Sequence, residues 1–209
     1  SKTDHEITSI IRFFKNMIFF SGHRIKQDLI VSVIKSHTLK ASLLAHLPAL
    51  NLDITNIHLS DESILLTHSQ QNHQADLTWE EESVGTRQLL CLFACIIQAM
   101  ENHTLILADD PEIHLHPKTV GYLYRLLSTP KTDTEGAQLI AATHENSNMN
   151  NSIFRRDELW LVSKDKEGSS SLYTLALFLK ENGEKVRKDE TYFKQYLEGR
   201  YGASPMITL

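Results

Sequence analysis

The sequence is poor in cysteine, and it lacks a secretory signal and a long apolar run. The two cysteines among 209 residues, Cys91 and Cys95, stand four positions apart in a segment predicted to be helical. This placement indicates reduced core residues rather than a disulfide, which suits a cytoplasmic protein. No apolar run reaches the ~18–20 residues of a membrane-spanning helix, and no secretory signal is evident. We therefore expect a cytoplasmic chain without a membrane partner.

An excess of basic residues is absent as well. The chain has 21 Lys and Arg against 26 Asp and Glu, a formal net charge of −5. This balance argues against a generally basic surface for nucleic acid, although it leaves room for a local basic patch. The 41% of hydrophobic residues is ordinary for a globular protein, and 209 residues are enough for a sizeable core.

The most informative stretch lies in the middle of the chain and has three parts. A polar turn, SVGTR at 83–87, precedes a largely apolar helix at about 88–100 and a short apolar strand at 104–108, which ends in Asp109 and Asp110. A helix that starts with Ser, Gly and Thr presents free N–H groups to an anion such as phosphate. Carboxylates at the carboxyl end of a buried strand lie where open α/β sheets bind ligands, and there they hold Mg²⁺ or activate water.

The first fifty residues are predicted to form a helical subdomain. Apolar side chains have helical spacing from residue 7 to residue 18, and Phe19 to Gly22 break the pattern. Residues 26–35 are apolar and β-branched, so helix and strand stay open, whereas 38–47 indicate a short helix before Pro48.

Strands and helices alternate in the remainder, residues 51–209, which predicts an α/β fold with a mostly parallel sheet flanked by helices. The segments expected are strands at 51–58, 62–67 and 138–142, a hairpin of 157–163 and 171–175, and helices from Pro117 and over 189–198. Residues 68–76 are polar and predict a loop. Its His68 and His73 are expected to be solvated rather than metal ligands.

Several motifs, in this order and at this spacing, resemble those of one family. SVGTR resembles the signature motif of ABC-type ATPases, in the S-x-G-T-R form of the SMC/RecF-like branch, LILADD resembles a Walker B strand and EIHLHP matches the D-loop position. QLIAATHE at 138–145 resembles the strand with the switch histidine. YLEGRYGASP at 196–205 is similar to the tail of the AAA-type ABC ATPases of bacterial anti-phage operons, such as the Septu ATPase. The resemblance covers roughly residues 75–209 and implies the C-terminal lobe of a P-loop NTPase.

The resemblance implies ATP and Mg²⁺ as cofactors and gives the motif residues their roles. Asp109 would hold the Mg²⁺ of Mg-ATP, Asp110 would polarise the attacking water, and His144 would bond the γ-phosphate and orient that water. The residues expected to contact the γ-phosphate of a nucleotide held by a second subunit are Ser83, Gly85, Thr86 and Arg87. The plainer alternatives are a turn-capping Asp109, a core His144, an N-cap at Ser83 and an Arg87 paired with Glu81 or Glu82.

Two departures from the family pattern stand out. Asp110 occupies the position where the family usually carries Glu, and the side chain, one methylene shorter, falls about 1 Å short, which can cost ~10²-fold in rate. No G-x-x-x-x-G-K-[ST] motif, the P-loop that cradles phosphates, occurs in the 209 residues. We therefore expect the C-terminal half of an ATPase, with its Walker A motif on another segment or chain.

Three functions follow from these patterns. The first is an ATPase subunit that dimerises head-to-tail around ATP, as a sensor or regulator in bacterial anti-phage defence or DNA metabolism, with a nuclease or toxin effector and nucleic acid as further partners. The second is a catalytically weak scaffold of the same fold that binds such an effector. The third is a metal-dependent nuclease built on Asp109, Glu112, His114 and His116, which leaves SVGTR and His144 unexplained.

Overall fold

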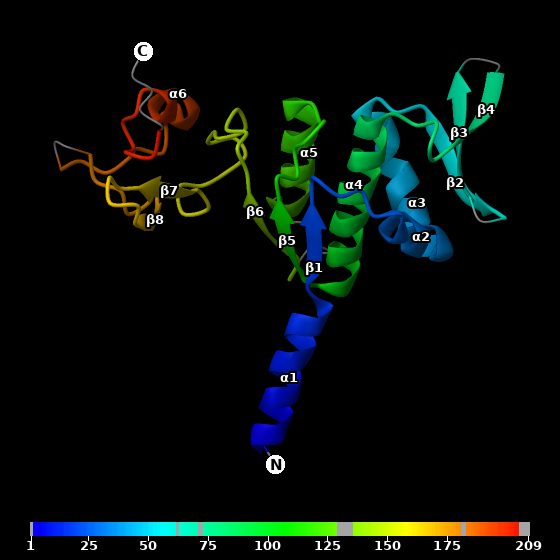
Figure 1. Cartoon of the computed structure of the whole chain (residues 1–209), viewed down its shortest axis with the longest axis horizontal. Coiled ribbons are helices and arrows are strands. Elements are labelled where there is room, and N and C mark those ends of the chain that lie inside the picture. The colour runs from blue at the N-terminus through cyan, green and yellow to red at the C-terminus, as the bar shows by residue number, and fades with distance from the viewer. Residues whose placement is uncertain (1, 62, 71–72, 129–135, 181–182, 205–209) are drawn as a thin grey trace. The chain divides into compact units, whose positions relative to one another are not determined.

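The computed structural model describes residues 2–61, 63–70, 73–128, 136–180 and 183–204 (Figure 1). The chain forms two compact units, Ser1–His144 and Glu145–Leu209. They divide at residue 144, whereas the sequence analysis placed a boundary at residue 50. The first unit contains all the residues expected to handle nucleotide.

A three-stranded parallel sheet lies at the centre of the first unit. Its strands β1 (Ile18–Ser21), β5 (Leu105–Asp109) and β6 (Gln138–Ala142) stand in the order β1-β5-β6. Phe20 is in register with Ala108, which is in register with Ala141. Because parallel strands share one direction, this register brings the ends of all three strands to one edge of the sheet.

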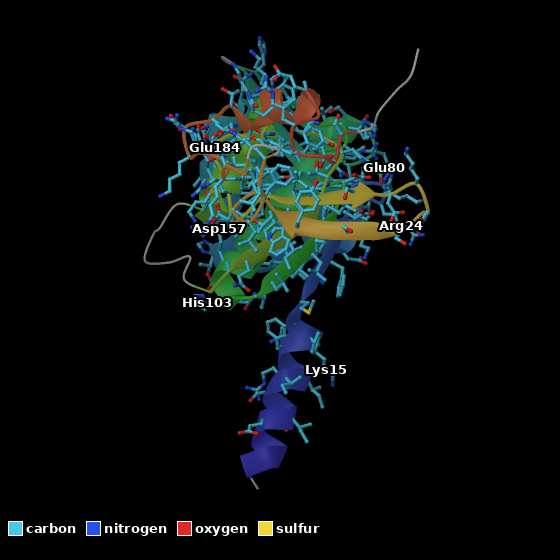
Figure 2. The ribbon with its side chains drawn as sticks, turned by 90° about the vertical axis from the view of Figure 1, so that its left-hand side faces the viewer. Lys15, Arg24, Glu80, His103, Asp157 and Glu184 are labelled. Carbon is cyan, nitrogen blue, oxygen red and sulfur yellow. The ribbon has the colours of Figure 1, made fainter. Side chains whose placement is uncertain are left out.

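The helix predicted to reach residue 18 ends earlier than expected. Helix α1 (Lys2–Asn16) stops at Asn16, and the next apolar residues form β1 instead. The spacing of apolar residues missed this strand because it is four residues long and depends on pairing with β5, in which Ile18 is in register with Ile106. All described side chains of α1 from residue 6 to residue 16 are exposed, and Figure 2 shows them around Lys15.

Helix α4 (Val84–Asn102) is the main core element, and together with α5 (Pro117–Ser128) it covers one face of the parallel sheet. Its residues 88–97 are all buried, as expected for a helix that is apolar on every side. By length and composition alone α4 could cross a membrane, contrary to our expectation that no segment qualifies, but 61% of its most apolar window is buried inside the unit. This burial identifies it as a core helix.

The opposite face of the parallel sheet is bare within the described part of the first unit, and we call it the bare face. Phe19, Leu107 and Ile140 form one row across the three strands on this face. Phe19 is 59% exposed and Ile140 is 62% exposed, although parallel sheets normally have both faces covered. Asp109 lies on this same face, two positions beyond Leu107.

The segment before α4 combines helices with an antiparallel sheet. Residues 26–35, left open between helix and strand, form helix α2 (Gln27–Lys35), and the short helix predicted before Pro48 is confirmed as α3 (His37–His46), followed by the 3-10 turn η1 (Leu47–Leu50). The sheet has the order β2-β3-β4, and its strands are Ile54–Ser60, Ser63–Gln70 and His73–Thr78.

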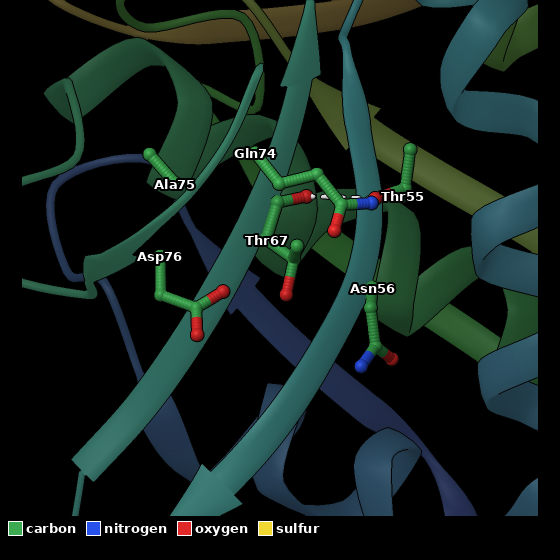
Figure 3. Close-up of a pocket in the computed structure, with 6 residues that line it drawn as sticks. All are labelled: Thr55, Asn56, Thr67, Gln74, Ala75 and Asp76. Carbon is green, nitrogen blue, oxygen red and sulfur yellow. Dashed lines mark hydrogen bonds between the residues drawn. The ribbon is translucent and has the colours of Figure 1, made fainter. Parts of the chain in front are cut away.

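The loop predicted at 68–76 is therefore wrong. Strand β3 extends to Gln70, and β4 pairs with it along its length. The first four side chains of β4 are exposed, so no alternation of apolar and polar residues marked the strand. The outer surface of this sheet carries an open polar groove (Figure 3), lined by Thr55, Asn56, Thr67, Gln74, Ala75 and Asp76.

The second unit is built around the predicted hairpin, which is confirmed. Strands β7 (Trp160–Lys164) and β8 (Ser170–Thr174) are antiparallel, and a short helix α6 (Tyr192–Leu197) follows within the predicted range 189–198. Tyr201, from the YLEGRYGASP motif, is fully buried in this unit's core, and its carbonyl accepts a hydrogen bond from the Tyr173 hydroxyl. Pro205, the last residue of that motif, lies outside the described residues.

The reactivity of the two cysteines tests whether α4 is buried. Cys91 and Cys95 are free and fully buried, and burial raises the pKa of each thiol to about 12. Because the thiolate is the reactive form, we expect iodoacetamide at pH 8 to modify the native chain at least ~10³-fold more slowly than a free cysteine. In denaturing urea both cysteines should react fully. Rapid alkylation of the native chain, followed by mass spectrometry, would contradict this packing.

Candidate functional site

The candidate site lies at the carboxyl edge of the parallel sheet. Asp109 is the last residue of β5, and its side chain is exposed. Its carbonyl accepts a hydrogen bond from the backbone N–H of Gly22 (2.8 Å), the residue that follows β1. The ends of β1 and β5 are thereby tied together, and the Asp109 carboxylate is held at the edge of the bare face.

Asp110 continues this pattern toward β6. Its backbone N–H donates to the carbonyl of Ala142 (2.9 Å), and its φ of 46° lies in the left-handed region, which Asp tolerates better than most residues. The side chain is 14% exposed and stands between two histidines. His23 Nε2 lies 3.1 Å from one carboxylate oxygen, and His144 Nε2 lies 3.9 Å from the other.

Glu112 ties the loop after β5 to the loop after β6. Its Oε1 accepts a hydrogen bond from the Thr143 hydroxyl (2.6 Å) and one from the backbone N–H of His144 (3.2 Å). The His144 side chain itself is 94% exposed. Its backbone is thus fixed while its imidazole is open to solvent, so a core role for His144 is excluded.

The SVGTR turn is the start of α4 rather than a loop before it. The helix begins at Val84, not near residue 88, and Ser83 is its N-cap: Ser83 Oγ accepts from the Thr86 N–H (3.0 Å) and lies 2.8 Å from Thr86 Oγ1. The N-cap alternative is therefore present in the structure. Glu81 bonds Thr78 and Glu82 bonds His68, so the pairing of Arg87 with either acid is not formed.

Gly85 has a packing reason in the first turn of α4. A Cβ at this position would lie 3.0 Å from the carbonyl oxygen of His114, in the EIHLHP segment. Such an approach is tighter than nearly all real Cβ contacts, so glycine lets the helix start pack against this loop. The segments that resemble the signature and the D-loop are therefore in contact within one chain.

The two histidines of EIHLHP do not form a metal centre. His116 Nδ1 accepts from the backbone N–H of Lys118 (3.2 Å) at the start of α5, and His114 has a φ of 63°. Among the described residues, no group of three or more His, Cys, Asp or Glu side chains is arranged to hold a metal ion. The four residues named for a metal-dependent nuclease, Asp109, Glu112, His114 and His116, are thus not among such a group in the described part of the chain.

Sequence reasoning missed two histidine contacts. His23 was not considered, because its contact with Asp110 joins residues 87 positions apart and no local pattern marks it. His68, expected in a solvated loop, lies on β3 between two carboxylates: its Nδ1 is 2.9 Å from Asp53, and its Nε2 bonds Glu82. Burial disfavours the charged ring, but the bonds to Asp53 and Glu82 outweigh this effect and raise the pKa of His68.

Two comparisons with known proteins bear on this geometry. A family model described as "AAA domain, putative AbiEii toxin, Type IV TA system" matches residues 21–150, more than half of the chain and all of the candidate site. A curated relative, OLD nuclease from Thermus scotoductus (strain ATCC 700910 / SA-01), is 30% identical over 101 residues, 46% of this chain. The aligned region is 19% of that relative, so the chain spans about a fifth of its length.

Gly22 offers a test of the contact between the ends of β1 and β5. A Cβ on Gly22 would stand 1.9 Å from the carbonyl oxygen of Asp110, closer than any real contact. We expect Gly22→Ala to lower the free energy of unfolding by roughly 3 kcal/mol. The neighbouring Ser21→Ala is the matched control, with an expected change within about 0.5 kcal/mol. Equal urea midpoints for the two variants would contradict the close approach.

Proposed function

The chain belongs to this AAA-domain family of P-loop ATPases, and on that premise we propose that it is an ABC-type ATPase subunit of the SMC/RecF-like branch. The observation that carries the proposal is the meeting of Asp109, Asp110 and His144 at one sheet edge, because His144 Nε2 lies 3.9 Å from Asp110. Two carboxylates and a histidine at this edge match the chemistry of nucleotide hydrolysis.

Asp109 is proposed to hold the Mg²⁺ that accompanies ATP. Mg²⁺ in nucleotide sites is bound by one or two carboxylates, substrate phosphates and water, not by a full set of protein ligands. The exposed Asp109 carboxylate at the end of β5 fits that kind of site. When bound, the ion would neutralise charge on the phosphates.

Asp110 and His144 are proposed to act on the attacking water. Asp110 is held through its backbone by Ala142 and through its side chain by His23, so its carboxylate has a defined position. His144 has its backbone fixed by Glu112 and its ring 94% exposed, which suits a residue that contacts a bound phosphate. Glu112 and His23 then orient the groups that carry out the chemistry.

The start of α4 is proposed to contact the γ-phosphate of a nucleotide on a second copy. Gly85, Thr86 and Arg87 lie at the start of a 19-residue helix whose N-cap is Ser83, and the positive end of a helix attracts anions. Within one chain this turn packs on the segment after β5, at His114. Two copies arranged head-to-tail would place each turn opposite the carboxylates of the other.

The P-loop is proposed to come from a segment outside residues 1–209 or from another chain. No Walker A motif occurs in the sequence, yet a phosphate-binding partner is needed beside Asp109. The bare face with Phe19, Leu107 and Ile140 ends at Asp109 and lacks the cover that parallel sheets require. This face is the docking surface we propose for the missing lobe.

The biological role is proposed to be that of a sensor or regulator in anti-phage defence or DNA metabolism, close to the Septu-type ATPases. The family description names a toxin of a toxin–antitoxin system, and the relative is named a nuclease. On these names we base the proposal that the chain is an ATPase that works with a nuclease or toxin effector, and we propose the cytoplasm as its location. Nucleic acid is a further proposed partner.

A second candidate is a scaffold of the same fold that hydrolyses ATP weakly or not at all. Two observations favour it: Asp110 is one methylene shorter than the usual Glu, and no P-loop occurs in the 209 residues. The substitution Asp110→Glu distinguishes the two candidate functions. It is made in this chain, and the chain is purified together with its native partners. A clear rise in Mg²⁺-dependent turnover supports a competent site, whereas unchanged, background turnover supports the scaffold.

The head-to-tail arrangement predicts complementation between two inactive variants. Asp109→Asn removes the Mg²⁺ ligand and Ser83→Ala removes the hydroxyl of the partner's turn, so each should abolish turnover alone. An equimolar mixture should recover about a quarter of wild-type turnover, because about half of the dimers are mixed and each keeps one intact site of two. ATP turnover by purified complexes measures this.

The control for complementation is a pair of variants on the same side of the composite site. Ser83→Ala mixed with Thr86→Ala leaves no intact site in any dimer and should stay inactive. His73→Ala, an exposed histidine on β4, should retain full turnover. Equal activity of both mixtures would contradict a site shared between two copies.

A further inference from the structure

His68 joins the antiparallel sheet to the start of α4. It lies on β3, with its Nδ1 2.9 Å from Asp53 Oδ1 and its Nε2 bonded to Glu82 Oε1. Asp53 directly precedes β2, and Glu82 directly precedes Ser83, the N-cap of α4. One imidazole therefore adds a side-chain link between β3, the residue before β2 and the residue before α4, beside the backbone hydrogen bonds from Ser69 to Asp53 and from Trp79 to Ile64.

The geometry defines the charge of this histidine. A neutral imidazole carries one N–H and one acceptor nitrogen, and an ionised carboxylate accepts only, so both contacts are satisfied together by the imidazolium. The partners of His68 on the neighbouring strands, Ile54 and Ala75, are uncharged. The charged groups that act on the ring are therefore the two carboxylates, Asp53 and Glu82.

Glu82 depends on this contact more than Asp53 does. Its side chain is 6% exposed, whereas that of Asp53 is 35% exposed. A buried carboxylate that loses its cation carries a large desolvation cost, because water cannot replace the lost partner without an opening of the structure. Glu82 itself belongs to the turn from Thr78 to Ser83, which leads into α4.

We propose that the imidazolium of His68 is the positioning group that holds the Ser83–Thr86 turn in place, through the buried Glu82. When His68 is neutral, the turn separates from the antiparallel sheet and the N-cap hydrogen bond from Thr86 to Ser83 is lost more often. Its consequence for turnover rests on the proposed function, since it presumes that this turn contacts nucleotide. We call the contact of His68 with Glu82 the clamp. The clamp itself does not depend on nucleotide.

The raised pKa of His68 decides whether the turn becomes more or less stable as pH rises. A histidine whose pKa is higher in the folded state stabilises that state below its unfolded pKa, and the stabilisation is lost as pH rises through the folded pKa. The turn should therefore be well protected near pH 6 and less protected near pH 9. The loss is roughly tenfold for each unit by which the pKa is raised.

Amide hydrogen exchange on the isolated full chain tests the clamp. Exchange is measured by NMR from pH 6 to pH 9 at the N–H groups of Glu82, Thr86 and Arg87, and is expressed as protection relative to the unstructured rate. We expect wild-type protection at these groups to fall across this range. Amides in the middle of α4 should keep theirs.

Two substitutions at position 68 separate charge from shape. His68→Gln lacks the cation at every pH, so its turn should have low protection that does not vary with pH. His68→Lys is charged throughout the range and should stay protected at pH 9. His73→Gln, on the exposed surface of β4, is the matched control and should behave like the wild type.

A wild-type turn whose protection does not change between pH 6 and pH 9, or a His68→Lys variant that keeps the wild-type pH dependence, would overturn the proposal. If His68→Gln does not fold by circular dichroism, the comparison of wild type with His68→Lys still decides. The proposed clamp and the proposed ATPase function can be rejected independently of each other. Normal pH-dependent protection with a fully active Ser83→Ala variant would reject the nucleotide contact and leave the clamp standing.

Discussion

The in-register parallel pairing of β1, β5 and β6 is the constraint on which the candidate site depends. It aligns the ends of three strands that are far apart in the chain, and two backbone hydrogen bonds, from Gly22 to Asp109 and from Asp110 to Ala142, extend the alignment past the strand ends. Asp110 thereby comes to lie between His23 and His144. Without the pairing, these side chains would have no reason to meet.

Helix α4 provides the rigid support for the turn that we propose to contact nucleotide. Its middle is buried on all sides, so its first turn has a fixed position. That turn is held by contacts of two kinds: Gly85 packs against His114, and the buried Glu82 binds His68 of the antiparallel sheet. The packing of Gly85 against His114 thus holds the turn on one side, and the titratable ion pair of His68 and Glu82 holds it on the other.

Much of this arrangement could be predicted from local patterns. The apolar helix, the strand ending in Asp109 and Asp110, and the strand before His144 are each marked by several consecutive residues. Strand β1 could not be predicted, because four residues at the end of a helical pattern become a strand only by pairing with β5. Strand β4 was missed because most of its side chains face solvent. The contacts of His23 and His68 join residues distant in sequence, so only the folded chain reveals them.

We propose that residues 1–209 carry the Mg²⁺-binding and water-activating part of an ATPase site whose P-loop lies elsewhere. The most direct measurement is Mg²⁺-dependent ATP turnover by this chain purified together with its native partners. The mass of every polypeptide is determined on the same sample. We expect turnover in a sample that contains a P-loop motif beyond these 209 residues, and we expect Asp109→Asn to abolish it. Turnover that survives Asp109→Asn in such a sample would show that Asp109 does not hold the Mg²⁺ of the site.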